Sequence, residues 1–213
     1  MHPGINGPKL KDKPALIMAG SGDVITHQEL NELSNQGAQL FRSLGLKPGD
    51  SMAFMMENHK LFFPIAFAAW RSGLKYTAIS WRLQANEVEY IVKDCGAKVF
   101  ITSKFLEDSA KDLASSLEGV HKFMLDGESG DFKSYEEAIK QMSVEPIEDE
   151  CQGAAMLYSS GTTGKPKGVS REINLSPLPY DSADDDLGLT RVVQGLYSAD
   201  EESIYLSPAP LYH

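Results

Sequence analysis

The stretch "SMAFMMENHKLFFPIAFAAWRSGLKYTAIS" (51–80) decides the expected fold of this chain. Residues 51–57 are an apolar run of strand length, residues 58–73 have the length of a helix, and residues 75–80 form a second strand-like run. A succession of strand, helix and strand is typical of a βαβ unit, whose two strands are parallel. The helix should pack deep in the domain, because its apolar residues leave little polar face.

The same alternation continues on both sides of this unit. Upstream, the sequence predicts a hairpin over 14–26 and a helix that begins with a capping box of Thr26 and Glu29 and ends at Gly45. Downstream, it predicts helices and strands in turn: helix 84–96, strand 97–103, helix 104–119, strand 120–126, helix 134–150 and strand 153–159. We therefore expect an α/β fold with a mostly parallel sheet flanked by helices, and a ligand site beyond the carboxyl ends of the strands.

The two ends of the chain are less regular. Residues 1–12 are polar and rich in glycine, proline and lysine, so we expect a flexible arm there. Residues 171–189 contain prolines and aspartates and should form an extended loop. A short helix over 190–198 and a short strand over 203–207 are expected near the end.

The charge, the cysteines and the apolar runs of the sequence exclude several classes of function. The net charge of −10 argues against sequence-independent binding to nucleic acid or to an anionic membrane. Cys95 and Cys151 are far apart and lack a CxxC or histidine-rich context, which predicts two free thiols in a reducing compartment. Neither a signal peptide nor a membrane-spanning run occurs in the sequence, so the cytoplasm is the expected location.

The stretch "LYSSGTTGKPKGVS" (157–170) carries the strongest functional signal. Its glycines allow backbone N–H groups to approach a phosphate closely, its hydroxyl groups can bind phosphate oxygens or Mg²⁺, and its lysines can offset negative charge. A flexible linker is the plain alternative, but a linker needs neither the Pro-Lys-Gly exit nor the apolar strand that precedes the loop. The stretch therefore predicts a phosphate-binding loop.

Three common motifs are excluded by spacing. A Walker A loop needs two glycines five residues apart followed by Lys and Ser or Thr, whereas Pro166 stands five residues after Gly161. The loop has no GxGxxG pattern of a dinucleotide site. Ser159 and Ser160 also lack the flanking glycines of a GxSxG nucleophile elbow.

The segment Tyr158–Gly168, "YSSGTTGKPKG", resembles the signature loop of the adenylate-forming superfamily, which includes acyl-CoA synthetases, luciferases and adenylation domains. The segments 26–58 and 68–102 and the terminal "YLSPAPLYH" (205–213) resemble other parts of the same family. The likeness is greatest to bacterial-type fatty-acyl-CoA synthetases. It implies an α/β fold in which residues 13–213 form an incomplete N-terminal AMP-binding domain.

The resemblance also implies a reaction. These enzymes use ATP to activate a carboxylate, here a fatty acid, as an acyl-adenylate, and then transfer the acyl group to a thiol, here coenzyme A. No nucleophilic side chain is required, because the protein positions groups and neutralises charge, so no catalytic residue is expected. Lys167 would neutralise the leaving pyrophosphate, and His213 would gate access to the acyl region. The residues implied to hold the phosphates of ATP are Ser159, Ser160, Gly161, Thr162, Thr163 and Gly164.

Several other residues carry weaker expectations. One of the two serines could face Mg²⁺, but no metal ligand is assigned. Lys165 occupies a position at which the family accepts any residue, so we expect a solvated cation there. For Trp81 and Arg82 we expect packing, and for Asp184–Asp186 an exposed turn or a helix N-terminus. The three histidines His27, His59 and His121 are expected at the surface or in caps.

The resemblance implies more chain than these 213 residues. The family has an acidic Mg²⁺ residue, a ribose-binding Asp and a mobile domain with a catalytic Lys, all further along. We therefore expect an N-terminal fragment that makes no acyl-CoA alone. We also expect an exposed apolar face, and from it a dimer, a swapped arrangement or poor solubility. A nucleotide-binding module without chemistry and an interaction fragment stay open as alternatives.

Overall fold

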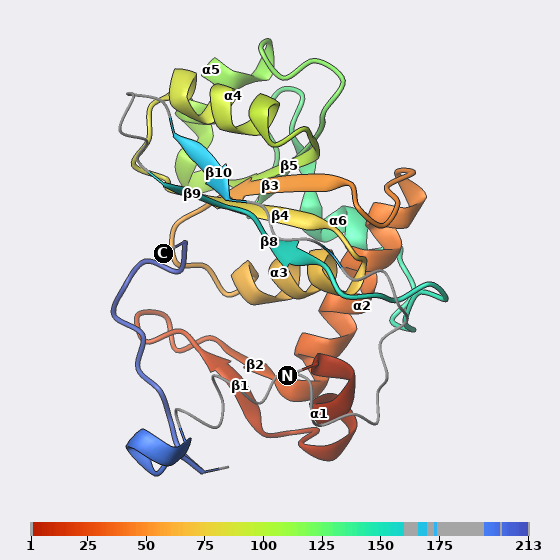
Figure 1. Ribbon diagram of the computed structural model, residues 1–213, viewed down its shortest axis with the longest axis vertical. Coiled ribbons are helices and arrows are strands. Elements are labelled where there is room, and N and C mark those ends of the chain that lie inside the picture. The colour runs from red at the N-terminus through yellow and green to blue at the C-terminus, as the bar shows by residue number, and fades with distance from the viewer. Residues whose placement is uncertain (1, 160–165, 170–172, 174–193, 201, 213) are drawn as a thin grey trace.

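The computed structural model describes residues 2–159, 166–169, 173, 194–200 and 202–212. Its centre is a six-stranded parallel sheet with the strand order β7-β6-β5-β3-β4-β8 (Figure 1). The strands are β3 (Ser51–Met55), β4 (Lys75–Ile79), β5 (Ala97–Ser103), β6 (His121–Leu125), β7 (Lys133–Ser134) and β8 (Ala154–Ala155). The predicted parallel sheet is confirmed, and β3 lies beside β4 and β5 in its interior.

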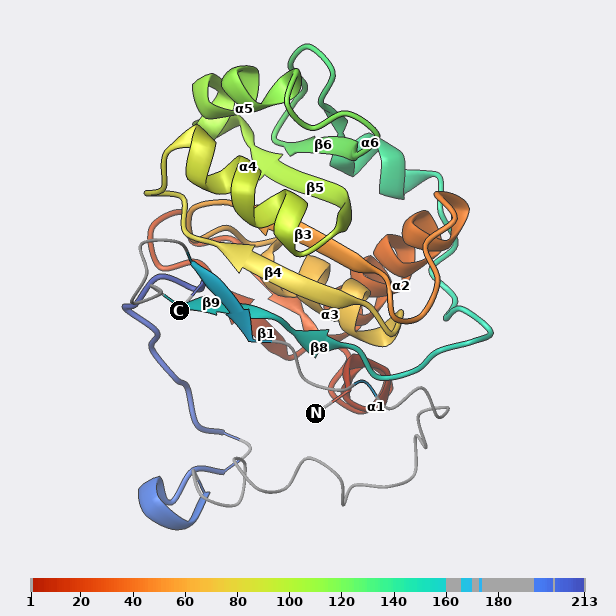
Figure 2. The same cartoon turned by 45° about the horizontal axis from the view of Figure 1, so that its top comes forward.

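Helices cover both faces of the sheet. The face that carries Phe54 and Ile101 packs against α2 (His27–Ser43), α3 (Phe62–Arg71) and α6 (Tyr135–Lys140). The opposite face, which carries Met55 and Phe100, packs against α4 (Ala85–Asp94) and α5 (Glu107–Ala114), the latter preceded by the short helix η1 (Lys104–Leu106). Figures 1 and 2 show the resulting three layers of helix, sheet and helix.

Local signals set the element ends as expected. β1 (Pro14–Ile17) and β2 (Val24–Thr26) form the predicted antiparallel hairpin. Thr26 and Glu29 form both halves of the capping box that begins α2. Gly45 and Gly96 follow α2 and α4 with positive φ values of 82° and 65°, which glycine adopts without a Cβ penalty.

The expectation of a flexible arm over 1–12 is not met. Residues Pro3–Lys9 form helix α1, with Pro3 at its first position and the His2 Nδ1 atom accepting a hydrogen bond from the Gly4 N–H at 2.9 Å. The helix packs against α2, and a Cβ on Gly7 would lie 2.9 Å from the Asn31 Cβ. Composition alone suggested an arm, but a proline at the helix start and a glycine at the contact suit a packed helix.

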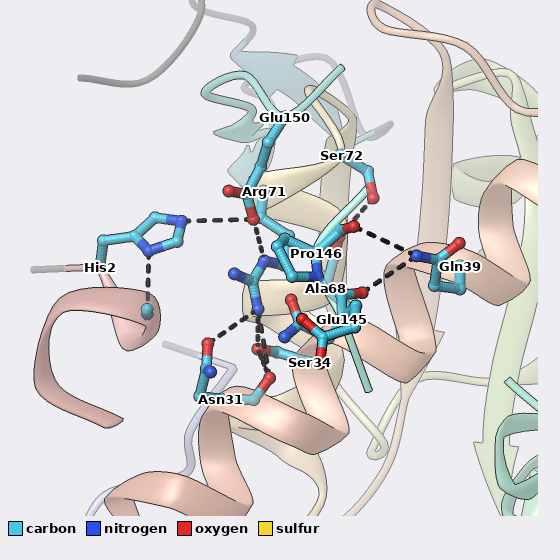
Figure 3. A network of polar contacts seen from close by, with 12 residues as sticks. His2, Asn31, Ser34, Gln39, Ala68, Arg71, Ser72, Glu145, Pro146 and Glu150 are labelled. Carbon is cyan, nitrogen blue, oxygen red and sulfur yellow. Dashed lines mark hydrogen bonds and ion pairs between the residues drawn. The ribbon is translucent and has the colours of Figure 1, made fainter. Parts of the chain in front are cut away.

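A buried ion pair links the end of α3 to the segment before β8 (Figure 3). Arg71, at the end of α3, pairs with Glu150, and both side chains are nearly inaccessible. The Arg71 Nη1 atom also donates to the Ser34 Oγ at 2.8 Å and to the Asn31 Oδ1 at 3.2 Å. His2 Nε2 lies 3.6 Å from the same Glu150 Oε1. The cluster therefore connects α2, α3 and the segment that leads to β8.

Three further expectations about elements are corrected. The helix predicted over 134–150 ends at Lys140, because the chain beyond it offers its carbonyl groups to α2, where Asn35 and Gln39 donate to Val144 and Glu145. The strand predicted over 153–159 is divided at Met156 into β8 and β9 (Leu157–Ser159). Residues 203–207 are not a strand; among the described residues they form no ladder and are exposed. The expected short helix is present at 194–197.

Candidate functional site

The predicted phosphate-binding loop connects the two strands of a hairpin. β9 precedes the loop and β10 (Lys167–Val169) follows it, and the two strands pair antiparallel. The chain enters the hairpin from β8, which is parallel to β4, so it advances toward the carboxyl ends of the strands (Figure 2). The Met156 N–H donates to the Tyr76 carbonyl at 2.8 Å and ties the base of the hairpin to β4. The loop is thus delivered to the edge of the sheet at which parallel α/β folds bind ligands.

The hairpin register places Ser159 directly opposite Lys167. Side chains directly opposite on an antiparallel pair have Cβ atoms about 4.5–5.5 Å apart and share one face. Both residues are exposed, as are Leu157 and Val169 further down the same face. A hydroxyl group and an ammonium group therefore stand side by side where the hairpin opens into the loop, as a phosphate site needs.

The other predicted site residues lie outside the described residues. They are Ser160, Gly161, Thr162, Thr163, Gly164 and His213. Lys165 and Asp184–Asp186 lie outside them too. Their expected roles stay predictions from the resemblance.

The opposite face of the hairpin packs against the sheet and α4. The Tyr158 hydroxyl donates a hydrogen bond of 2.5 Å to Asp94 Oδ2 at the end of α4. The pKa of Tyr158 is raised far above its usual range, mainly by burial and to a lesser extent by the hydrogen bond to Asp94. Tyr158 therefore remains protonated and keeps its donor at any physiological pH.

The segment that resembles the second family motif lies at the same edge of the sheet. The Leu211 N–H donates to Asn58 Oδ1 at 3.0 Å, and the Asn58 amide donates to the Ala209 carbonyl at 3.2 Å. Asn58 follows β3, so residues 209–211 lie beyond the carboxyl end of a central strand (Figure 1). The structure thus brings both sequence motifs to one side of the fold.

Two of the weaker candidates, Trp81 and His59, make defined contacts in the described part of the chain. Trp81 packs edge-on against Phe105 at 6.0 Å, and the Arg82 guanidinium lies 4.7 Å from the centre of the Trp81 ring. His59 is buried; its Nδ1 accepts from the Leu61 N–H at the start of α3, and its Nε2 lies 3.1 Å from Asp126 Oδ2. The predicted packing of Trp81 is confirmed, whereas His59 is buried and makes its contact just before α3, which has no side-chain cap.

The two cysteines of the chain are also buried. Cys95 and Cys151 are free and buried, as predicted, and burial raises the pKa of each thiol. Both thiols are therefore protonated and unreactive near neutral pH.

The described ranges of the chain contain neither a metal-ligand cluster nor a membrane-spanning helix. No cluster of three or more histidine, cysteine or acidic side chains in that part of the chain could hold a metal ion. None of the helices described there has the length and apolar character needed to cross a bilayer.

The sequence did not reveal that Asp94 and Asn58 hold the two motifs in place. Asp94 is the last residue of α4 and Asn58 follows β3, and the sequence alone assigned neither residue a role. Their partners are 64 and 153 residues away in the chain. Only the folded sheet brings such positions together.

Comparison with known proteins agrees with this geometry. The family model described as "AMP-binding enzyme" matches residues 6–213. The chain belongs to this family of AMP-binding enzymes.

Individual relatives act on different acids. The chain is 29% identical over 157 residues to the fatty acid–[acyl-carrier-protein] ligase ScoC of Streptomyces coeruleorubidus, a match that covers 73% of this chain and 29% of the relative. It is 30% identical over 168 residues to 4-coumarate–CoA ligase 2 of Petroselinum crispum, covering 77% and 30%. The chain therefore spans less than a third of the length of these two relatives.

A solved structure shows the same fold. The anthranilate CoA ligase AuaEII, in complex with anthranoyl-AMP, matches with a TM-score of 0.71 and 22% identity over 78% of this chain and 33% of that chain. At this identity the likeness concerns the fold alone. It agrees with the mostly parallel sheet flanked by helices.

Proposed function

We propose that this chain binds ATP through the loop between β9 and β10, as part of an enzyme that activates a carboxylic acid as an acyl-adenylate and transfers it to coenzyme A. The observation that carries this proposal is the register that sets Ser159 opposite Lys167 at the mouth of the signature loop. Family membership and the position of the hairpin beyond the parallel sheet support it.

The residues predicted to bind phosphate have the following proposed roles. The hydroxyl of Ser159 and the ammonium of Lys167 would bind phosphate oxygens, with Lys167 neutralising the pyrophosphate as it leaves. We assign the remaining phosphate contacts to Ser160, Gly161, Thr162, Thr163 and Gly164, and the gate beside the acyl group to His213. No side chain of this chain is assigned a nucleophilic role.

Mg²⁺ fits the same site as a companion of ATP. Mg²⁺ in nucleotide sites keeps several waters and is held mainly by the phosphates, so a dedicated cluster of acidic residues is unnecessary. A serine hydroxyl at the mouth of the loop is an oxygen donor of the kind that Mg²⁺ accepts, and Ser159 is exposed there. When bound, the ion would neutralise charge on the transferring phosphates.

The identity of the carboxylic acid substrate and the cellular location are more specific proposals. A fatty acid is our first candidate substrate, from the resemblance to fatty-acyl-CoA synthetases, and the ligation of a fatty acid by ScoC supports it. The relative that acts on 4-coumarate makes an aromatic acid the competing class. Buried free thiols support a cytoplasmic location. The complete reaction is assigned to a protein with the length of the relatives, of which this chain spans less than a third.

Replacing Lys167 by alanine is expected to weaken binding of ATP·Mg²⁺ about 10- to 100-fold, because a hydrogen bond to a charged group contributes about 1.5–3 kcal/mol. Isothermal titration of the 213-residue chain measures the dissociation constant. Lys165→Ala is the matched control and should change the constant less than about twofold, because the family that the loop resembles accepts any residue at this position. An equal loss in both variants would contradict the assignment of Lys167, and no binding by the unaltered chain would contradict the proposed function.

We also propose that copies of the chain associate through exposed apolar side chains. Ile204, Tyr205 and Leu206 are 87%, 88% and 72% exposed, and Leu157 and Val169 are exposed on the hairpin. Exposed apolar side chains that gather on a surface mark interaction sites. Light scattering should give a mass above 23.4 kDa that falls in the double variant Ile204→Ser, Leu206→Ser. A monomeric mass for the unaltered chain at high concentration would refute the association.

A further inference from the structure

Two contacts fix the hairpin that carries the loop. At its base, the Met156 N–H donates to the Tyr76 carbonyl of β4. In its middle, the Tyr158 hydroxyl donates to Asp94, which lies at the last position of α4 and 64 residues earlier in the chain. The first contact fixes where the hairpin begins, and the second can fix how it is inclined against α4.

The hairpin is shaped to let Tyr158 reach that helix. Gly168 is paired with Tyr158 across the ladder. A Cβ at position 168 would lie 2.8 Å from Tyr158 Cζ, 3.0 Å from its hydroxyl oxygen and 2.4 Å from Met156 Cε. Because real Cβ atoms do not approach so closely, the absence of a side chain at Gly168 is what allows the ring to lie across β10.

The contact also has the chemistry of a directional anchor. A phenol that donates to a carboxylate makes a short, charge-assisted hydrogen bond, and 2.5 Å lies in that range. The Tyr90 hydroxyl lies 3.5 Å from the other oxygen, Asp94 Oδ1, on the same helix. Asp94 therefore holds a local helix contact and a long-range hairpin contact, and these can be removed separately.

We infer that Asp94 is a positioning residue for the phosphate-binding hairpin, an assignment that rests on the proposed function of the loop. Through Tyr158, it holds β9 and β10 against α4. The Ser159 and Lys167 pair, one residue along each strand, is then aimed at the triphosphate of ATP. Neither Asp94 nor Tyr158 needs to touch the nucleotide for this role. Their removal should weaken ATP binding without unfolding the domain.

The test is a double-mutant cycle on ATP affinity in the full 213-residue chain, read by isothermal titration with ATP·Mg²⁺. Tyr158→Phe and Asp94→Ala should each raise the dissociation constant about fivefold, the equivalent of one hydrogen bond. The double variant should show the same rise as each single variant, because both remove one interaction. Asp94→Asn keeps an acceptor oxygen and should stay within about twofold of the unaltered chain.

Two controls separate positioning from mere stability. Tyr90→Phe removes the local partner of Asp94 and should leave the ATP affinity unchanged. Thermal unfolding should give the same midpoint for Tyr158→Phe as for Tyr90→Phe. If Asp94→Ala and Asp94→Asn lose the same ATP affinity, and their thermal unfolding midpoints fall by the same amount, Asp94 has a structural role. That result would overturn the inference.

The remaining outcomes separate a failure of the inference about Asp94 from a failure of the proposed ATP binding by the loop. If the unaltered chain binds ATP, Lys167→Ala weakens it, and Tyr158→Phe and Asp94→Ala bind normally, the inference is overturned and the proposed function stands. If the unaltered chain binds neither ATP·Mg²⁺ nor pyrophosphate, the proposed function fails and the inference fails with it. Additive losses in the double variant would also overturn the inference, since the two residues would then act independently.

Discussion

Replacing Arg71 by alanine should lower the free energy of unfolding by about 3–5 kcal/mol, because it leaves a buried carboxylate without its partner. The Arg71 side chain is 1% exposed and the Glu150 side chain 5%. Burial lowers the pKa of the Arg71 guanidinium, and the neighbouring Glu150 carboxylate opposes that shift. The guanidinium also supports Ser34 and Asn31 on α2, so its loss would leave several polar groups unsatisfied (Figure 3).

Urea denaturation of the purified variants would measure this effect. Lys93→Ala breaks the exposed pair with Glu89 on α4 and should cost about 0.5 kcal/mol or less, which makes it the matched control. The double variant Arg71→Met, Glu150→Leu removes both charges and should recover much of the loss. A change below about 1 kcal/mol in Arg71→Ala would mean that this pair does not stabilise the packing of α2, α3 and the segment before β8.

Replacing Gly153 by alanine should lower the free energy of unfolding by about 3 kcal/mol, at the upper end of the usual cost of overpacking. A Cβ there would lie 2.3 Å from the Leu74 carbonyl oxygen, 2.8 Å from the Leu74 nitrogen and 3.0 Å from the Trp70 carbonyl oxygen. All three atoms belong to the backbone, which cannot yield as a flexible side chain can. The Gly153 N–H also donates to the Trp70 carbonyl at 2.6 Å, so relief of the clash would break this bond.

Gly20→Ala is the control for this prediction. Nothing lies within 4 Å of a Cβ at Gly20, so that variant should be as stable as the unaltered chain or slightly more stable. Denaturant unfolding compares the two variants directly. Because β8 follows Gly153 and leads into the hairpin, Gly153→Ala should also weaken ATP binding. Equal stability of the two variants would contradict the close approach of Gly153 to the end of α3.

Elements with local signals could be read from the sequence. Residues 51–55 and 62–71 follow from apolar runs of strand and helix length, and Thr26 with Glu29 defines the start of α2. Gly96 marks the end of α4. These features are predictable because a cap, a turn or a buried face depends on residues within a few positions of one another.

Elements that depend on distant partners were not predictable. Residues 1–12 read as an arm, yet they contain a helix because Gly7 meets Asn31 on α2. The helix predicted over 134–150 stops at Lys140, where carbonyl groups turn to side chains of α2. The exposed residues 203–207 have the composition of a strand, but a strand exists only where a neighbouring strand pairs with it.

For the candidate site too, some features could be read from the sequence and others depended on the tertiary structure. The sequence by itself determined the α/β class and predicted a phosphate-binding loop, because strand and helix periodicity and the glycine, hydroxyl and lysine content of 157–170 are local properties. Only the tertiary structure decided that Ser159 faces Lys167, that Tyr158 reaches Asp94, and that Asn58 holds residues 209–211. The physical reason is that strand register, helix placement and chain crossing bring together atoms up to 153 residues apart, and no local pattern encodes those distances.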